Sequence, residues 1–169
     1  ERICKTENGN KKLILSAVLL HDIIKIKNRK DSAIKSAKLS KKILKENNFL
    51  DDEIGIIFDA IKEHSFSKGK IPSSIEGKIL QDADRLDAIG AIGLARVFSF
   101  SGSNNRPFYD PKDPFSRNRS VNDNKWALDH FFEKLLTLEK KMNTKTGKIL
   151  AKNRTKILKN FLKELKSEI

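Results

Sequence analysis

Along most of the chain, apolar residues recur at intervals of three and four positions, which places them on one face of an α-helix. This pattern predicts helices over residues 11–24, 31–47, 51–64, 73–100, 122–142 and 144–166. No stretch shows the sustained alternation of apolar and polar residues that is typical of a half-buried strand. The pattern therefore predicts an all-α fold, organised as one compact domain over residues 1–169.

Several of these helices begin with residues that commonly cap helices. Ser73 and Glu76 have the spacing of a capping box at the start of the longest predicted helix. Asp51 and Thr144 stand before two others. By contrast, residues 101–122 contain three prolines and show no periodicity. A loop of this length in a compact domain is usually functional or disordered, so we expect it to act as a lid.

The net charge of +13 invites a nucleic-acid-binding interpretation. Most of the basic residues are lysines, however, and lysine, asparagine and isoleucine are all abundant, as in proteins from AT-rich genomes. Recognition of nucleic acid by bidentate contacts generally uses arginine. We therefore favour a solvated lysine-rich surface over nucleic-acid binding.

The single cysteine, Cys4, cannot form an internal disulfide, which favours a reducing, cytoplasmic environment. The longest apolar run, residues 13–20, is too short to span a bilayer, so no membrane partner is expected. The opening residues read as the tail of a helix. We therefore expect the chain to lack an N-terminal helix of its domain.

Acidic residues are concentrated in the otherwise apolar helix expected around residues 80–96. Asp82, Asp84 and Asp87 lie within six positions, and Arg85 stands among them. Carboxylates near a buried helix need a partner, and a metal ion is the obvious one. A second candidate is the His21–Asp22 pair, which follows the most apolar helix. Imidazole nitrogen and carboxylate oxygen together suit Mn, Ni, Fe, Mg or Zn.

Taken together, these motifs resemble the HD superfamily of metal-dependent phosphohydrolases. That family has an early His, then a His-Asp pair, then a later Asp, all on helices. Residues 79–93, ILQDADRLDAIGAIG, are similar to the signature of a small bacterial branch described as uncharacterised or nucleotide pyrophosphohydrolase-like. Residues 63–66, 106–111 and 129–136 resemble that branch as well.

The resemblance implies an HD-type helical fold and one divalent metal ion held by His21, Asp22 and Asp84. Asp82 is the rival to Asp84. The family's ligand is the first Asp of an Asp-x-x-Asp step, which favours Asp84. Asp22 would also count among the catalytic residues, with His64 and Glu63 handling the proton of the water or the leaving group.

The same resemblance implies an enzyme that hydrolyses a phosphate ester or anhydride, with a nucleotide as the preferred substrate. A metal-bound hydroxide would attack phosphorus. Arg85, Arg106, Lys68 and Lys70 would bind the phosphates. The sequence leaves a homodimer open, and for His130 we favour a packing or hydrogen-bonding role.

Two departures from the family pattern keep alternatives open. No His precedes His21, so the family's first ligand is missing from the sequence. Ser32 stands where the branch commonly has a His after Asp31. The first alternative is a non-catalytic HD-like module that binds nucleotide or metal. The second is a basic helical nucleic-acid-binding protein.

Overall fold

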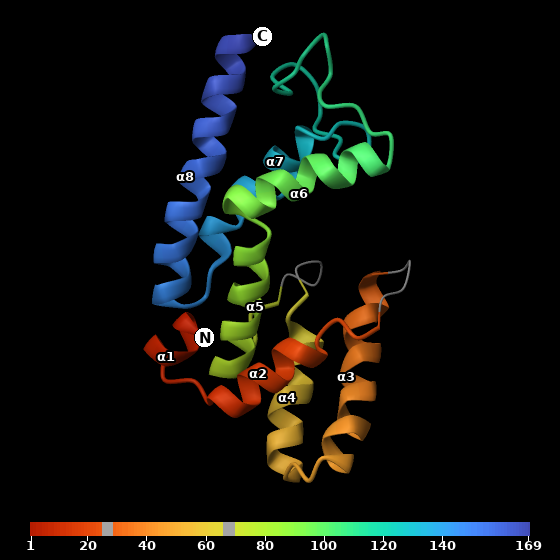
Figure 1. The fold of residues 1–169 in the computed structure, drawn as a ribbon, viewed down its shortest axis with the longest axis vertical. Helices are drawn as coiled ribbons and strands as arrows, with labels where there is room; N and C mark the ends of the chain where they lie inside the picture. The colour runs from red at the N-terminus through yellow and green to blue at the C-terminus, as the bar shows by residue number, and fades with distance from the viewer. Residues whose placement is uncertain (25–28, 66–69) are drawn as a thin grey trace. The chain divides into compact units, whose positions relative to one another are not determined.

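The structure is a computed structural model, and it describes residues 1–24, 29–65 and 70–169. Every regular element in these ranges is a helix (Figure 1). The all-α prediction is therefore confirmed. No helix in the described ranges is both long and apolar enough to cross a membrane.

The chain divides into two compact units. Unit 1 contains residues 1–84 and 143–147, and unit 2 contains residues 85–142 and 148–169. One boundary falls inside helix α5 (Ile75–Asp87). The single-domain expectation for residues 1–169 stays a prediction.

Unit 1 is built from the helices of the first half of the chain, which are α1 (Arg2–Thr6), α2 (Lys11–Leu20), α3 (Arg29–Glu46), α4 (Asp51–Glu63) and most of α5. Helix α4 packs against α2 and α3, and Figure 1 shows α3 and α4 side by side. Their shared core consists of Leu13, Ala17, Ala37, Leu44, Ile54, Ile57, Ala60, Ile61 and Leu80. These residues follow the three-and-four spacing read from the sequence, so the predicted apolar faces are the buried faces.

Unit 2 contains the elements α6 (Gly90–Ser103), α7 (Asp129–Glu133), η2 (Leu135–Thr137), η3 (Glu139–Lys141) and most of α8 (Lys145–Glu168). Phenylalanines supply much of its packing. The rings of Phe98 and Phe108 are stacked with centroids 4.3 Å apart, and those of Phe131 and Phe161 are 5.7 Å apart. Aromatic side chains thus pack against one another within this unit.

The prediction of one long helix over residues 73–100 is wrong, because two helices occupy this stretch. Helix α5 ends at Asp87 and α6 begins at Gly90. Gly90 has φ +84°, a left-handed conformation that glycine adopts without steric cost. A Cβ at this position would also press on the side chain of Arg154. The apolar periodicity continues through the break, and this is why the pattern alone did not reveal it.

The predicted capping box at the start of α5 is also wrong. The hydroxyl of Ser74, not of Ser73, accepts the amide of Gly77 at 3.0 Å. Glu76 instead accepts the backbone amide of Asn10. Ser73 donates its amide to the Glu63 carboxylate, so both predicted partners have more distant contacts in unit 1.

The helix predicted over residues 122–142 is mostly absent. Only the short α7 and two 3-10 turns form there. The amides of Ala127 and Leu128 donate to the carbonyls of Pro107 and Phe108, both at 2.9 Å. These N–H groups are therefore used in pairing with a distant segment, so the turn that begins at Asn122 cannot continue as a helix.

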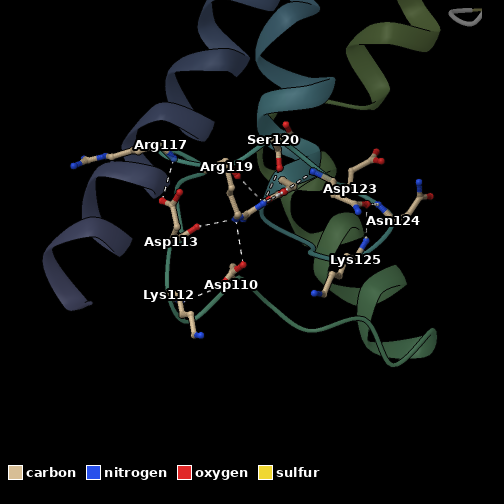
Figure 2. Close-up of polar contacts among 12 residues, drawn as sticks. Asp110, Lys112, Asp113, Arg117, Arg119, Ser120, Asp123, Asn124 and Lys125 are labelled. Atoms are coloured by element: carbon tan, nitrogen blue, oxygen red, sulfur yellow. Dashed lines mark hydrogen bonds and ion pairs between the residues drawn. The ribbon is translucent and has the colours of Figure 1, made fainter.

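A buried carboxylate, Asp129, organises the loop that precedes α7. Arg119 donates to its two oxygens at 2.6 and 2.8 Å. The Asn122 amide and the Ser116 hydroxyl donate to it as well. Burial acts to raise the pKa of Asp129, but these hydrogen bonds, with that from Arg119 the strongest, bring it below its ordinary value. Arg119 also pairs with Asp110, so one guanidinium links two parts of the loop (Figure 2).

Replacing Arg119 with Lys tests this organisation. Lys keeps the charge but cannot donate to both oxygens of Asp129, so we expect the free energy of unfolding to fall by about 1–3 kcal/mol. Denaturant unfolding of the variant measures the effect. The matched control is Arg117→Lys, since Arg117 is exposed and should change stability little. Equal stability of the two variants would show that the bidentate pair does not hold the loop.

Candidate metal centre

The candidate centre lies in unit 1, where two helices end close together. Helix α2 is capped at its start by Asn10, whose side chain accepts the amide of Leu13, and it continues as a helical turn to His21. Helix α4 likewise ends in a helical residue, His64. The packing of α2 on α4 brings these two ends together. The ring centroids of His21 and His64 are 5.0 Å apart and the rings are nearly perpendicular, at 88°.

Asp22 completes a group of three potential ligands. One atom from each of His21, Asp22 and His64 lies within 4.8 Å of the other two. The carboxylate of Asp22 is 3.9 Å from the Nε2 atom of each imidazole. This is the only such group among the described residues.

Both imidazoles are oriented by backbone carbonyls. Nδ1 of His21 lies 2.7 Å from the carbonyl oxygen of Val18, and Nδ1 of His64 lies 2.6 Å from that of Ile61. A carbonyl can only accept, so Nδ1 must carry the proton in each ring. The lone pair is then left on Nε2, the atom that faces Asp22. Metal-binding histidines are typically oriented in this way.

His64 is buried, with 6% of its surface exposed. Burial lowers the pKa of its imidazole below the ordinary value, because the charged form loses its hydration. The Ile61 carbonyl and the carboxylates of Asp84 and Asp22 act in the opposite direction. The net effect favours the neutral ring, which is the form that binds metals.

Two imidazoles and one carboxylate would suit a divalent transition metal, since they combine borderline nitrogen with hard oxygen. The structure thus brings together His21 and Asp22, as predicted for ligands, and adds His64, which we had placed with the catalytic residues. Asp84 is not in this group, although its charge acts on His64. Its role as a ligand stays a prediction. His64 is 42 residues beyond Asp22 in the sequence, and only the packing of α2 on α4 shows that they meet.

Asp82, the rival to Asp84, has other partners. It is fully buried, and its carboxylate accepts the amides of Asn143 and Thr144, both at 2.8 Å. The Thr144 hydroxyl donates to it at 2.8 Å as well. These hydrogen bonds occupy both oxygens of Asp82, whereas the charge of Asp84 acts on His64.

Glu63 and Lys70 form an ion pair. The ammonium of Lys70 lies 2.8 Å from the carboxylate of Glu63, which also accepts the amide of Ser73 at 3.1 Å. The hydrogen bond from Lys70 is the main cause that lowers the pKa of Glu63. The sequence predicted a catalytic role for Glu63 and phosphate binding for Lys70. In the structure these two side chains form an ion pair with each other. Lys68 lies outside the described residues.

The predicted substrate-binding arginines belong to unit 2 and make internal hydrogen bonds. Arg85 is buried and donates to the carbonyl of Lys141. Arg106 donates to the hydroxyl of Ser101 at 2.7 and 3.0 Å, and to a backbone carbonyl at residue 123. These hydrogen bonds do not test whether Arg85 and Arg106 bind phosphate, which stays a prediction.

The remaining polar candidates are also hydrogen-bonded. Nδ1 of His130 lies 2.8 Å from the carboxylate of Asp123 in unit 2. In unit 1 the hydroxyl of Ser32 donates to the carbonyl of Ile24. Ser32 therefore offers its proton to the backbone at the position where the family resemblance implies an imidazole.

Known proteins resemble this chain in sequence. The HD domain family model matches residues 1–89, the part of the chain that contains His21, Asp22, His64 and Asp84. The protein YpgQ of Bacillus subtilis (strain 168) is 34% identical over 172 residues, covering 99% of this chain and 77% of YpgQ.

Solved structures are similar over nearly the whole chain. A protein from Lactobacillus plantarum is 37% identical with a TM-score of 0.75, covering 99% of this chain and 80% of that one. YpgQ in complex with ADP is 32% identical with a TM-score of 0.78, covering 99% and 79%. An HD-superfamily hydrolase from Bacillus thuringiensis is 33% identical with a TM-score of 0.77, covering 99% and 78%.

The helical fold and the paired imidazoles beside a carboxylate define an all-α protein with a His–Asp–His group where two helices end. The chain belongs to the HD domain family. The resemblance read from the sequence is thereby confirmed, and it extends to relatives described as hydrolases.

Proposed function

We propose that this protein is a metal-dependent phosphohydrolase that cleaves a phosphate ester or anhydride of a nucleotide. The observation that carries the proposal is the convergence of His21, Asp22 and His64, with both Nδ1 atoms bonded to carbonyls. A nucleotide is supported by the relative YpgQ, one of whose crystal structures is a complex with ADP.

The chain's own residues would divide the work as follows. His21 and His64 would offer Nε2, and Asp22 and Asp84 would offer carboxylate oxygens. A divalent ion bound there would supply activation of water and neutralisation of phosphoryl charge. The Asp22 side chain is half exposed, so one of its oxygens can also accept a proton from water at the site.

Glu63 is the last residue of α4, directly before His64, and Lys70 lies six residues beyond His64. Lys70 is exposed and donates to the buried Glu63. When substrate binds, the Lys70 ammonium would turn to a phosphate. The Glu63 carboxylate, no longer paired with Lys70, could then accept a proton. Both roles follow the family resemblance.

We expect Arg85→Ala to raise KM or lower kcat for phosphate substrates while metal affinity stays near the wild-type value. Loss of one charge-assisted phosphate contact should cost about 1.5–3 kcal/mol in kcat/KM. Steady-state kinetics and Mn titration measure the two effects separately. Because Arg85 also donates to Lys141, unfolding should be measured in parallel. Lower stability with unchanged kinetics would assign Arg85 to packing alone.

Metal titration of the metal-free protein, followed by a hydrolysis assay, tests the proposed function. Protein stripped with EDTA is loaded in turn with Mn, Ni, Fe, Zn and Mg, and release of phosphate and pyrophosphate from nucleoside di- and triphosphates is measured. The proposal requires binding of at least one ion and hydrolysis only in its presence. A protein that binds none of these ions and hydrolyses none of these substrates would overturn it.

A second candidate is a non-catalytic module that binds nucleotide or metal. Ser32 favours it, because its hydroxyl is directed to the Ile24 carbonyl and cannot act as an imidazole acid. In that case the protein would bind Mn and ADP but release no phosphate. Nucleic-acid binding would instead show an affinity that falls steeply with salt.

A further inference from the structure

A buried chain of hydrogen bonds in unit 1 runs from Glu63, the residue before His64, to the start of α8. Its central members are Gln81 and Asp82 on α5, which both have an exposed fraction of 0%. Buried amides and carboxylates are costly unless they are fully hydrogen-bonded. Apolar side chains could fill the same space, but they could not hold backbone groups in one position.

Gln81 joins α5 to the end of α4. Its Nε2 donates to the carbonyls of Glu63 and Lys70, both at 3.0 Å. Glu63 is the residue directly before His64. The Gln81 amide therefore fixes the main chain at the point where His64 leaves α4.

Asn143 in turn orients Gln81. Its Nδ2 donates to Oε1 of Gln81 at 2.9 Å and to Oδ1 of Asp82 at 2.9 Å. The four N–H groups of the two side-chain amides then each have an acceptor. Because every donor faces an acceptor, only one orientation of each amide satisfies the network.

Asp82 anchors Asn143 from the other side. Its carboxylate accepts the amides of Asn143 and Thr144 and lies at the N-terminus of α8, where the helix dipole favours negative charge. Gly147 leaves room for this approach, since a Cβ there would clash with Oδ2 of Asp82. The segment 143–147 is thereby held against the residues that precede Asp84.

We propose that Asn143 is a positioning residue for the metal centre. By orienting Gln81 it fixes the carbonyl of Glu63, and so the direction in which Nε2 of His64 points. Gln81 also lies three residues before Asp84 on α5. The network therefore contacts both the end of α4 that carries His64 and the helix that carries Asp84. The inference rests on the proposed function, because it requires a metal at His64.

The Asn143→Ala variant tests the inference by Mn affinity. Free Mn is followed by electron paramagnetic resonance, and denaturant unfolding is measured separately in EDTA. Loss of a group that orients a ligand typically weakens metal binding by about 10–100-fold. We expect a rise in Kd for Mn of about tenfold at least, in protein that remains folded. The matched control is Asn153→Ala, which removes an exposed amide on α8 and should leave Kd unchanged.

Gln81→Met is the second variant, since it keeps the side-chain volume and removes the bonds to Glu63 and Lys70. It should also weaken Mn binding, even if Asn143→Ala fails to fold. A folded Asn143→Ala or Gln81→Met protein with wild-type Kd for Mn would overturn the inference while leaving the proposed function intact. Wild-type protein that binds no Mn or other divalent ion would overturn the proposed function first, and this inference with it.

Discussion

The His21→Ala variant is expected to lose metal binding and nucleotide hydrolysis together. The change removes one of the two imidazoles whose Nε2 atoms face Asp22. Because the His21 side chain is at the surface end of α2 and partly exposed, its loss should leave the fold intact. Metal content after dialysis, phosphate release and the unfolding curve measure the three quantities on one preparation.

His130→Ala is the matched control for this prediction. His130 is the remaining histidine of the chain, and it is bonded to Asp123 in unit 2 rather than grouped with the metal ligands. The control should bind metal as the wild-type protein does. If His21→Ala retained both metal and turnover, the centre would have to be built from other residues.

Asp84→Ala and Asp82→Ala are expected to fail in different ways. The Asp84 variant should lose metal binding and hydrolysis with a nearly unchanged free energy of unfolding, because it removes a charge beside His64. The Asp82 variant should lose stability instead. It leaves the donors of Asn143 and Thr144 without their acceptor, and each buried group left unsatisfied costs about 1–3 kcal/mol.

Urea unfolding and Mn titration of both variants separate the two roles, with Asp87→Ala as the control. Asp87 is exposed and pairs with Arg96 at the surface, so its loss should have a minor effect on either measurement. Damage to metal binding in the Asp87 variant, with an active Asp84 variant, would show that the ligand had been placed on the wrong acid.

Much of the helical structure could be predicted because its causes are local. The apolar stripes of α2, α3 and α4 require only the spacing of a few neighbouring residues. The start of α8 was predicted for the same reason, since Thr144 accepts the amide of Gly147 three residues later. The family was also readable from short motifs, and the match to residues 1–89 confirms it.

The helix predictions were wrong where the cause lies outside the local apolar pattern. The break at Gly90 does not interrupt the apolar pattern, and the amides of Ala127 and Leu128 are taken by Pro107 and Phe108. Local spacing carries no information about such partners. The Arg119–Asp129 pair, likewise, is a contact across a loop in which no periodicity exists.

By itself, the sequence determined the helical class, the family and the identity of the His21–Asp22 pair, since these depend on composition and on neighbours in the chain. Only the tertiary structure decided that His64 joins that pair, and that Asp82 turns to Asn143 and the start of α8. The physical reason is that a ligand group and a buried hydrogen-bond network are both defined by directions in space. Those directions exist only once α2 has packed on α4 and the segment 143–147 has met α5.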